Sequence, residues 1–221
     1  MASRQAFAVK DCALIAIATG RKATGLTGLL DNLQRINTDS IYHHFWGGLL
    51  SPRFEVREFN NDFAGWVRHS LQESVLSERL AVIDPGGFAN LEELRHELVD
   101  IIEERLDESE SSRWLRARRQ FEFLRSRLVV FDTFLEIDRP EELPEVVKKM
   151  STSSIFYHFI DSRRRLDICC DDFSYWLNGF GDDYQELQRE LAAFDPFFSS
   201  LSQTRDGLAR LFLRYFTGGS R

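Results

Sequence analysis

The sequence contains no apolar run of about 18 residues, the length that a helix needs to cross a bilayer. It also contains no charged segment followed by an apolar one, the pattern of a secretory signal. Cysteine is scarce: Cys12 stands alone, and Cys169 and Cys170 are adjacent, so no paired spacing indicates a disulfide framework. We therefore expect a cytoplasmic protein with no membrane partner.

Positive charge is also in short supply. The formal net charge is −7, which argues against nonspecific binding to nucleic acid because phosphate contacts need a positive protein surface. The chain has 221 residues, 43% of them hydrophobic and 13% aromatic, which is enough to bury a core as one or two globular domains.

Two stretches of the chain nearly repeat one another. Residues 40–45 read Ser-Ile-Tyr-His-His-Phe and residues 154–159 read Ser-Ile-Phe-Tyr-His-Phe, while Asn-Asp-Phe-Ala-Gly-Trp at 61–66 returns as Asp-Asp-Phe-Ser-Tyr-Trp at 171–176. The alignment keeps one constant offset from Phe7 with Phe121 to Ile41 with Ile155. This pattern predicts a tandem duplication, with a first repeat at 6–106, a charged connector at 107–119 and a second repeat at 120–216.

Each predicted repeat opens with a short buried strand, because residues 7–18 and 121–134 are rich in apolar and β-branched side chains. Apolar residues at helical spacing follow, for example at 26–36 and 91–106 in the first half. The predicted fold class is therefore mainly α with a short strand at the start of each repeat, as two tandem homologous helical repeats.

Histidine and aspartate recur in both halves, as His43, His44 and Asp62 and as His158 and Asp172. An imidazole beside a carboxylate can act as a general base or ligate a metal. The simpler interpretation is structural: each Asp caps a helix, each His fills a core position with a hydrogen-bond partner, and Trp66 and Trp176 lie on the buried stripe of the same helix. The chain has too few histidines and cysteines for two tetrahedral sites, so we expect no catalytic residue, no metal and no cofactor.

A glycine-rich and threonine-rich stretch, read as a loop between strand and helix, is the preferred small-molecule site. Backbone N–H groups at a helix start, helped by basic side chains, suit an anion, although the spacing of a P-loop is missing. The candidate ligand-binding residues are Thr19, Gly20, Arg21, Lys22, Thr24, His43 and His44. A plain turn explains the same stretch without a ligand.

Four motifs of the first half resemble those of an uncharacterised bacterial and archaeal domain of unknown function. They read Ala-Thr-Gly-Arg-Lys-Ala at 18–23, Ser-Ile-Tyr-His-His at 40–44, Asn-Asp-Phe-Ala-Gly-Trp at 61–66 and Ile-Asp at 83–84. The second half departs from the first motif, with Asp-Thr-Phe-Leu-Glu at 132–136. The resemblance implies a fold but no mechanism, since such a family has no established activity.

Two classes of function remain open. A helical core without a polar catalytic cluster favours a non-enzymatic interaction or ligand-sensing module, with an unknown protein partner or a small anionic ligand and a possible homodimer. The alternative is an enzyme acting on a phosphorylated or sugar-like substrate at a groove between the repeats, near Arg21, Lys22, His43 and His44. No Gly-x-Ser-x-Gly nucleophile motif occurs in the sequence.

Overall fold

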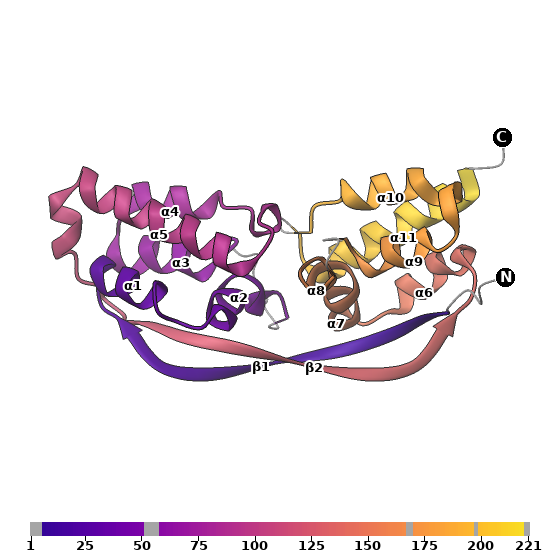
Figure 1. Cartoon of the computed structure of the whole chain (residues 1–221), viewed down its shortest axis with the longest axis horizontal. Helices are drawn as coiled ribbons and strands as arrows, with labels where there is room; N and C mark the ends of the chain where they lie inside the picture. Colours follow the sequence, from indigo (N-terminus) through magenta and orange to yellow (C-terminus); the bar gives the residue numbers. More distant parts are fainter. Residues whose placement is uncertain (1–5, 51–57, 167–169, 197–198, 219–221) are drawn as a thin grey trace. The chain divides into compact units, whose positions relative to one another are not determined.

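The computed structural model describes residues 6–50, 58–166, 170–196 and 199–218 (Figure 1). Most of these residues are helical. Two strands of 17 residues each, β1 (Phe7–Ala23) and β2 (Phe121–Ile137), pair with one another as a two-stranded antiparallel sheet. Among the described helices, none combines the length and apolar character needed to cross a bilayer.

The fold class predicted from the sequence is wrong about the strands. They are long, and they pair with each other instead of each opening a helical repeat of its own. Gly20 and Phe134, with φ angles of 78° and 58°, are left-handed residues of the kind that commonly begin a loop, yet both lie inside the strands. The tandem repeat that the sequence suggested is not shown by this architecture.

The chain divides into two compact units. The contiguous unit is Leu14–Arg127, and the split unit joins Met1–Ala13 to Leu128–Arg221. Each unit therefore contains part of both strands. The boundaries 6–106, 107–119 and 120–216 follow sequence similarity and stay a prediction.

The helices of the contiguous unit are α1 (Leu26–Leu33), α2 (Thr38–Trp46), α3 (Asp62–Trp66), α4 (Ser74–Ala81) and α5 (Leu91–Glu108). A π-helical turn, Val67–Leu71, extends α3, and short 3₁₀ turns lie at Gly47–Leu49, Pro85–Gly87 and Glu110–Trp114. The long helix α5 packs against α1, α2 and α4. The side chains of Leu26, Leu29, Ile41, Phe63, Leu98 and Ile102 are fully buried in this core.

The segment predicted as a charged connector is docked within the contiguous unit. The backbone N–H of Ala117 donates to the carbonyl of Thr24 at 2.9 Å, and that of Arg118 to the carbonyl of Ser70 at 2.9 Å. Charges of opposite sign also pair here, with Arg113 Nη2 lying 3.0 Å from Asp107 Oδ1. These exposed ion pairs add little to the free energy of unfolding.

The helices of the split unit are α6 (Leu143–Lys149), α7 (Thr152–Ile155), α8 (Ser162–Arg165), α9 (Asp172–Asn178), α10 (Gln185–Ala192) and α11 (Leu201–Gly218). A π-helical segment, Phe156–Asp161, joins α7 to α8, and 3₁₀ turns lie at Pro140–Glu142 and Gly181–Tyr184. The long helix α11 packs against α6, α7 and α10. The fully buried side chains include Leu143, Val147, Phe156, Phe159, Phe173, Leu208 and Phe212.

Candidate functional site

Thr19, Gly20, Arg21 and Lys22, which were predicted to lie in an anion-binding loop, lie inside strand β1, and Thr24 directly follows the strand. The stretch is thus not a loop at residues 19–22, and its ligand binding stays a prediction. Thr19 Oγ1 donates to the carbonyl of Phe123 at 2.6 Å, and Lys22 Nζ pairs with Glu122 Oε1 at 2.8 Å. Arg21 Nη1 lies 3.4 Å from Asn32 Oδ1. These side chains therefore join β1 to β2 and to α1.

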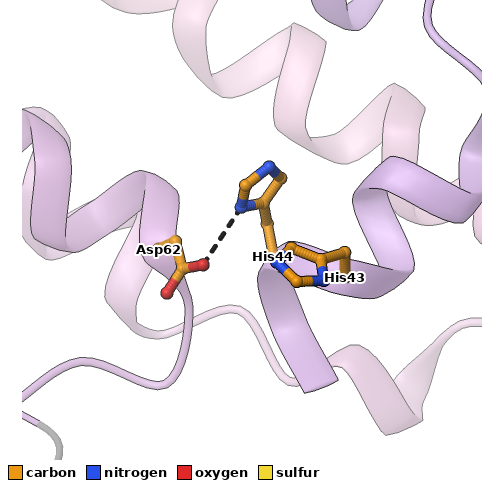
Figure 2. Close-up of side chains that lie close together, drawn as sticks. All are labelled: His43, His44 and Asp62. Atoms are coloured by element: carbon orange, nitrogen blue, oxygen red, sulfur yellow. Dashed lines mark hydrogen bonds and ion pairs between the residues drawn. The ribbon is translucent and has the colours of Figure 1, made fainter. Parts of the chain in front are cut away.

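His43, His44 and Asp62 come together in the contiguous unit, as the sequence suggested (Figure 2). His44, on α2, is buried, and its Nδ1 lies 3.0 Å from Asp62 Oδ2 on α3. His43 Nδ1 lies 2.6 Å from Ser126 Oγ of β2. One potential ligand atom from each of the three residues lies within 4.8 Å of the others, a spacing that a metal ion could use.

The hydrogen bond at Nε2 of His44 shows which of the two ring nitrogens carries the proton. His44 Nε2 accepts the backbone N–H of Leu124 at 3.2 Å, so Nε2 carries no proton. The ring proton is then on Nδ1 and is donated to Asp62. A metal on Nδ1 would move that proton to Nε2, where it would face the Leu124 N–H, donor against donor. The hydrogen bonds of His44 therefore favour a structural role over metal ligation.

Ser40 completes the arrangement around Leu124. Its Oγ donates to the Leu124 carbonyl at 2.6 Å, so Ser40 and His44 together hold both backbone polar groups of one strand residue. Ser40 and His44 are four positions apart on α2 and share one face of the helix. We call Ser40, His44 and Asp62 the contiguous-unit clamp.

The split unit contains a clamp of the same composition, formed by Ser154, His158 and Asp172. His158 Nε2 accepts the backbone N–H of Lys10 at 2.8 Å, and Ser154 Oγ donates to the Lys10 carbonyl. His158 Nδ1 lies 2.7 Å from Asp172 Oδ2. We call these three residues the split-unit clamp.

The aspartates of both clamps differ from their predicted role. The helix caps are the preceding residues: Asn61 Oδ1 accepts the N–H of Ala64 at 2.8 Å, and Asp171 Oδ1 accepts the N–H of Ser174 at 2.9 Å. Asp62 and Asp172, one position further on, instead bind the imidazoles. The Asp directly before Phe-x-x-Trp is therefore not the helix cap, contrary to the prediction; the cap is the residue before it.

An aromatic ring from the strand packs on each clamp. Phe121 lies 4.6 Å from His44 and stacks on Phe63 at 5.2 Å, measured between ring centroids. In the split unit, Phe7 lies 4.9 Å from His158 and stacks on Phe173 at 5.2 Å. These ring contacts contribute to the burial of both imidazoles, and burial strengthens their hydrogen bonds.

The two tryptophans that the sequence predicted as buried differ in environment. Trp66 is buried, and its indole N–H donates to the carbonyl of Arg119 at 2.7 Å. Trp176 is only half-buried and lines a pocket. The sequence offered one signal of this difference, because Gly65 precedes Trp66 whereas Tyr175 precedes Trp176.

The pocket lies wholly within the split unit and has a volume of about 500 Å³. Its lining residues come from the start of β1 and the residue before it, the π-helical segment, and helix α9 with the two residues after it: Ala6, Phe7, Ala8, Lys10, Tyr157, His158, Asp172, Tyr175, Trp176, Asn178, Gly179 and Phe180. This volume is in the range of about 300 to 1,000 Å³ that is typical of small-molecule sites. Sequence reasoning missed Lys10, Tyr157, Tyr175, Asn178 and Phe180, which come from three separate segments of the chain.

Charged groups in and behind the pocket are paired. Asp172 Oδ2 lies 2.8 Å from Arg165 Nη2, and the Arg165 guanidinium lies 4.2 Å from the centre of the Tyr157 ring. Lys10 Nζ pairs with Asp132 Oδ2 at 2.7 Å. Burial raises the pKa of the Tyr157 phenol above its ordinary value, so its hydroxyl stays protonated near neutral pH.

A carboxylate oxygen of the pocket has no partner among the described residues. Asp172 accepts the hydrogen bonds of His158 and Arg165 through Oδ2, and no described group bonds to its Oδ1. Because Oδ1 is not among the buried unsatisfied atoms, it remains accessible. A hydrogen-bond acceptor is therefore open beside aromatic rings, an arrangement suited to a ligand that carries a donor.

The chain is therefore a mainly helical protein in which two Ser-His-Asp clamps bind the backbone of a two-stranded sheet. The model of a family described as a family of unknown function, DUF5752, matches residues 4–213, and the chain belongs to this family. A solved structure, described as that of OrfY from Thermoproteus tenax, is similar with a TM-score of 0.82 and 25% sequence identity, covering 96% of this chain and 95% of that one. No curated protein matches the sequence.

Proposed function

We propose that the protein is a non-enzymatic ligand-sensing module and that its ligand binds in the pocket of the split unit. The observation that carries this proposal is that two residues belong both to the split-unit clamp and to the pocket. His158 and Asp172 form the clamp that holds Lys10, and they also line the pocket. A ligand in the pocket would therefore contact the groups that hold strand β1.

The sensing step follows from the two oxygens of Asp172. Oδ2 orients His158, and Oδ1 is open to a ligand donor. A donor bound to Oδ1 would restrict the carboxylate and with it the imidazole that accepts the Lys10 N–H. Ligand binding would then strengthen the hold on this end of β1, a change in local stability that a protein partner could read.

Hydrogen bonding favours binding over catalysis. Both nitrogens of His44 and of His158 have partners in the clamps, which leaves neither ring a free nitrogen to accept a substrate proton. Burial raises the pKa of the Cys12 thiol to about 12, and the charge of Asp11 adds to the effect, so this cysteine is a poor nucleophile.

A thermal-shift screen of a metabolite library tests the proposal. We expect at least one compound to raise the melting temperature of the wild-type chain and to lose this effect in Tyr175→Ala, because Tyr175 lines the pocket and is 57% exposed. Trp114→Ala is the matched control, since Trp114 is 74% exposed in the contiguous unit. The same compound should slow hydrogen exchange at the Lys10 amide. If every hit also stabilised Tyr175→Ala, the pocket would be the wrong site.

The spacing of His43, His44 and Asp62 favours a second candidate, a metal-dependent enzyme acting on a phosphorylated or sugar-like substrate. Elemental analysis separates the two functions. We expect no metal in stoichiometric amount, because metal binding at His44 would break its hydrogen bond with Leu124. Zinc, iron or manganese near one equivalent, lost in Asp62→Asn while the chain stays folded, would favour the enzyme instead.

A further inference from the structure

The rings around the pocket face in different directions. Trp176 and Phe180 are nearly perpendicular, at 83° with ring centroids 5.2 Å apart, and Trp176 is inclined at 51° to Phe7. Tyr157 stands at 82° to His158. The rings of each of these neighbouring pairs are inclined to one another, so together they form no single flat surface for a planar base. Such walls suit a puckered ring that presents C–H groups in several directions.

The charges of the pocket are balanced before any ligand binds. Lys10 is paired with Asp132, and Asp172 is paired with Arg165. These pairs are exposed, and a charged ligand would have to compete with the protein group that already neutralises each charge. The pairing therefore favours a neutral ligand.

The open hydrogen-bonding groups include both donors and acceptors. Asp172 Oδ1 accepts, the Tyr157 hydroxyl can donate, and the exposed amide of Asn178 can do both. A ligand that matches all three must itself donate and accept at closely spaced positions. Hydroxyl groups around a ring do so, whereas a quaternary ammonium group does neither.

From these observations we infer that the pocket binds a neutral saccharide, a single sugar or a disaccharide, with a ring face on Trp176 or Tyr175 and hydroxyl groups on Asp172 and Asn178. This inference rests on the proposed function, because it names the ligand class of the same pocket. The pocket volume of about 500 Å³ leaves room for one or two sugar rings.

The test measures binding of four probe classes to the full chain by ligand-observed NMR and calorimetry. The probes are neutral sugars (glucose, galactose and maltose), glucose 6-phosphate, choline and adenosine, each at millimolar concentration. We expect a neutral sugar to bind more tightly than the other three classes. Tyr175→Ala and Asn178→Ala, which change exposed side chains, should each weaken sugar binding about tenfold, as expected for the loss of one good contact. Trp114→Ala should bind as tightly as the wild type.

Three outcomes would overturn the inference, and they affect the proposed function differently. Binding of choline, adenosine or glucose 6-phosphate in preference to the neutral sugars, lost in Tyr175→Ala, overturns the ligand class and leaves the ligand-sensing module standing. Sugar binding that is unchanged in both Tyr175→Ala and Asn178→Ala overturns the site for sugars. Binding of no probe, together with no hit in the metabolite screen, overturns the inference and the proposed function together.

Discussion

The imidazole of His158 accepts the backbone N–H of Lys10, a residue 148 positions earlier in the chain, at 2.8 Å. Because Nε2 accepts this hydrogen bond, the ring proton is on Nδ1, which donates to Asp172 at 2.7 Å. A buried histidine thus holds a strand to helices that are distant in sequence.

Replacing this histidine should loosen the strand. We expect His158→Phe to lower the free energy of unfolding by about 2 kcal/mol, since it keeps a ring but leaves the Lys10 N–H without an acceptor. Urea unfolding measures the loss, and hydrogen exchange at the Lys10 amide locates it. His44→Phe is the matched variant in the contiguous unit and should expose the Leu124 amide instead. Unchanged protection of Lys10 in His158→Phe would contradict the clamp.

The cap of α9 gives a pH dependence with a defined sign. Burial raises the pKa of the Asp171 carboxyl above its ordinary value, although hydrogen bonds from Ser174 act against the shift. The folded chain therefore holds this proton more tightly than the unfolded chain, and the free energy of unfolding falls as pH rises from the unfolded pKa through the folded one. Asp171→Asn should remove this decline. Between acidic pH and pH 7, its free energy of unfolding should therefore fall less than that of the wild type.

Asn61 provides the matched control, because it caps α3 from an equally buried position. Asn61→Asp should lower the free energy of unfolding at pH 7, since it buries a carboxylate and loses the 2.8 Å donation from Asn61 Nδ2 to the Leu80 carbonyl. Urea unfolding of both variants from acidic to neutral pH decides the matter. Parallel pH profiles of Asp171→Asn and wild type would argue against a raised pKa at Asp171.

Glycine at position 134 should relieve the backbone strain in β2. Phe134 has a φ of 58°, a left-handed conformation that costs most side chains about 1 to 2 kcal/mol, and its ring is 90% exposed. We expect Phe134→Gly to raise the free energy of unfolding by about 0.5 to 1 kcal/mol, after allowing for the greater freedom of glycine in the unfolded chain. A loss of stability would mean that the Phe134 ring packs on something.

Gly20 is the opposite case on β1. Its φ is 78°, and a Cβ at this position would meet nothing within 4 Å, so only the backbone opposes a side chain. Gly20→Ala should therefore lower the free energy of unfolding by about 1 kcal/mol. Thermal unfolding of the two variants should move in opposite directions.

Thiol reactivity tests the burial of Cys12. Its pKa of about 12 leaves a thiolate fraction at pH 8 on the order of a thousandfold below that of an ordinary thiol. For Cys170, burial together with the charge of Asp171 raises the pKa to about 11, so the reduction is on the order of a hundredfold. Alkylation followed by peptide mass spectrometry should find Cys12 slower than Cys170 in the folded chain and equal to it in urea. Cys169 lies outside the described residues.

The helices were largely predictable and the sheet was not. The apolar spacing at Leu26, Leu29 and Leu33 indicated a helix, and α1 confirms it, because a helix pattern depends on residues close in sequence. Strand length gave no such signal: residues 129–136 of β2 are exposed, so no buried face imposes alternation of polar and apolar side chains. Gly20 looked like the start of a loop because a left-handed glycine serves loops and bent strands equally well.

The candidate site, too, could be predicted from the sequence only in part. The neighbourhood of His44 and Asp62 could be predicted, since both residues recur in short motifs that fold locally. The acceptor role of His158 toward Lys10 could not, because nothing near either residue records a contact across 148 positions. The pocket depends on that contact, since Phe7 and Lys10 form part of its wall.

The order of the chain in the two units has a consequence for synthesis on the ribosome. The contiguous unit, Leu14–Arg127, is complete as soon as β2 has begun to emerge, so it can fold while translation continues. Phe7 and Val9 are made earlier but are buried only with residues from Leu128 onward. At about 5 to 20 residues per second, the nascent strand at Lys10 waits roughly 7 to 30 seconds for His158 to be added. During that interval the apolar side chains of this segment lack the partners that bury them in the folded split unit.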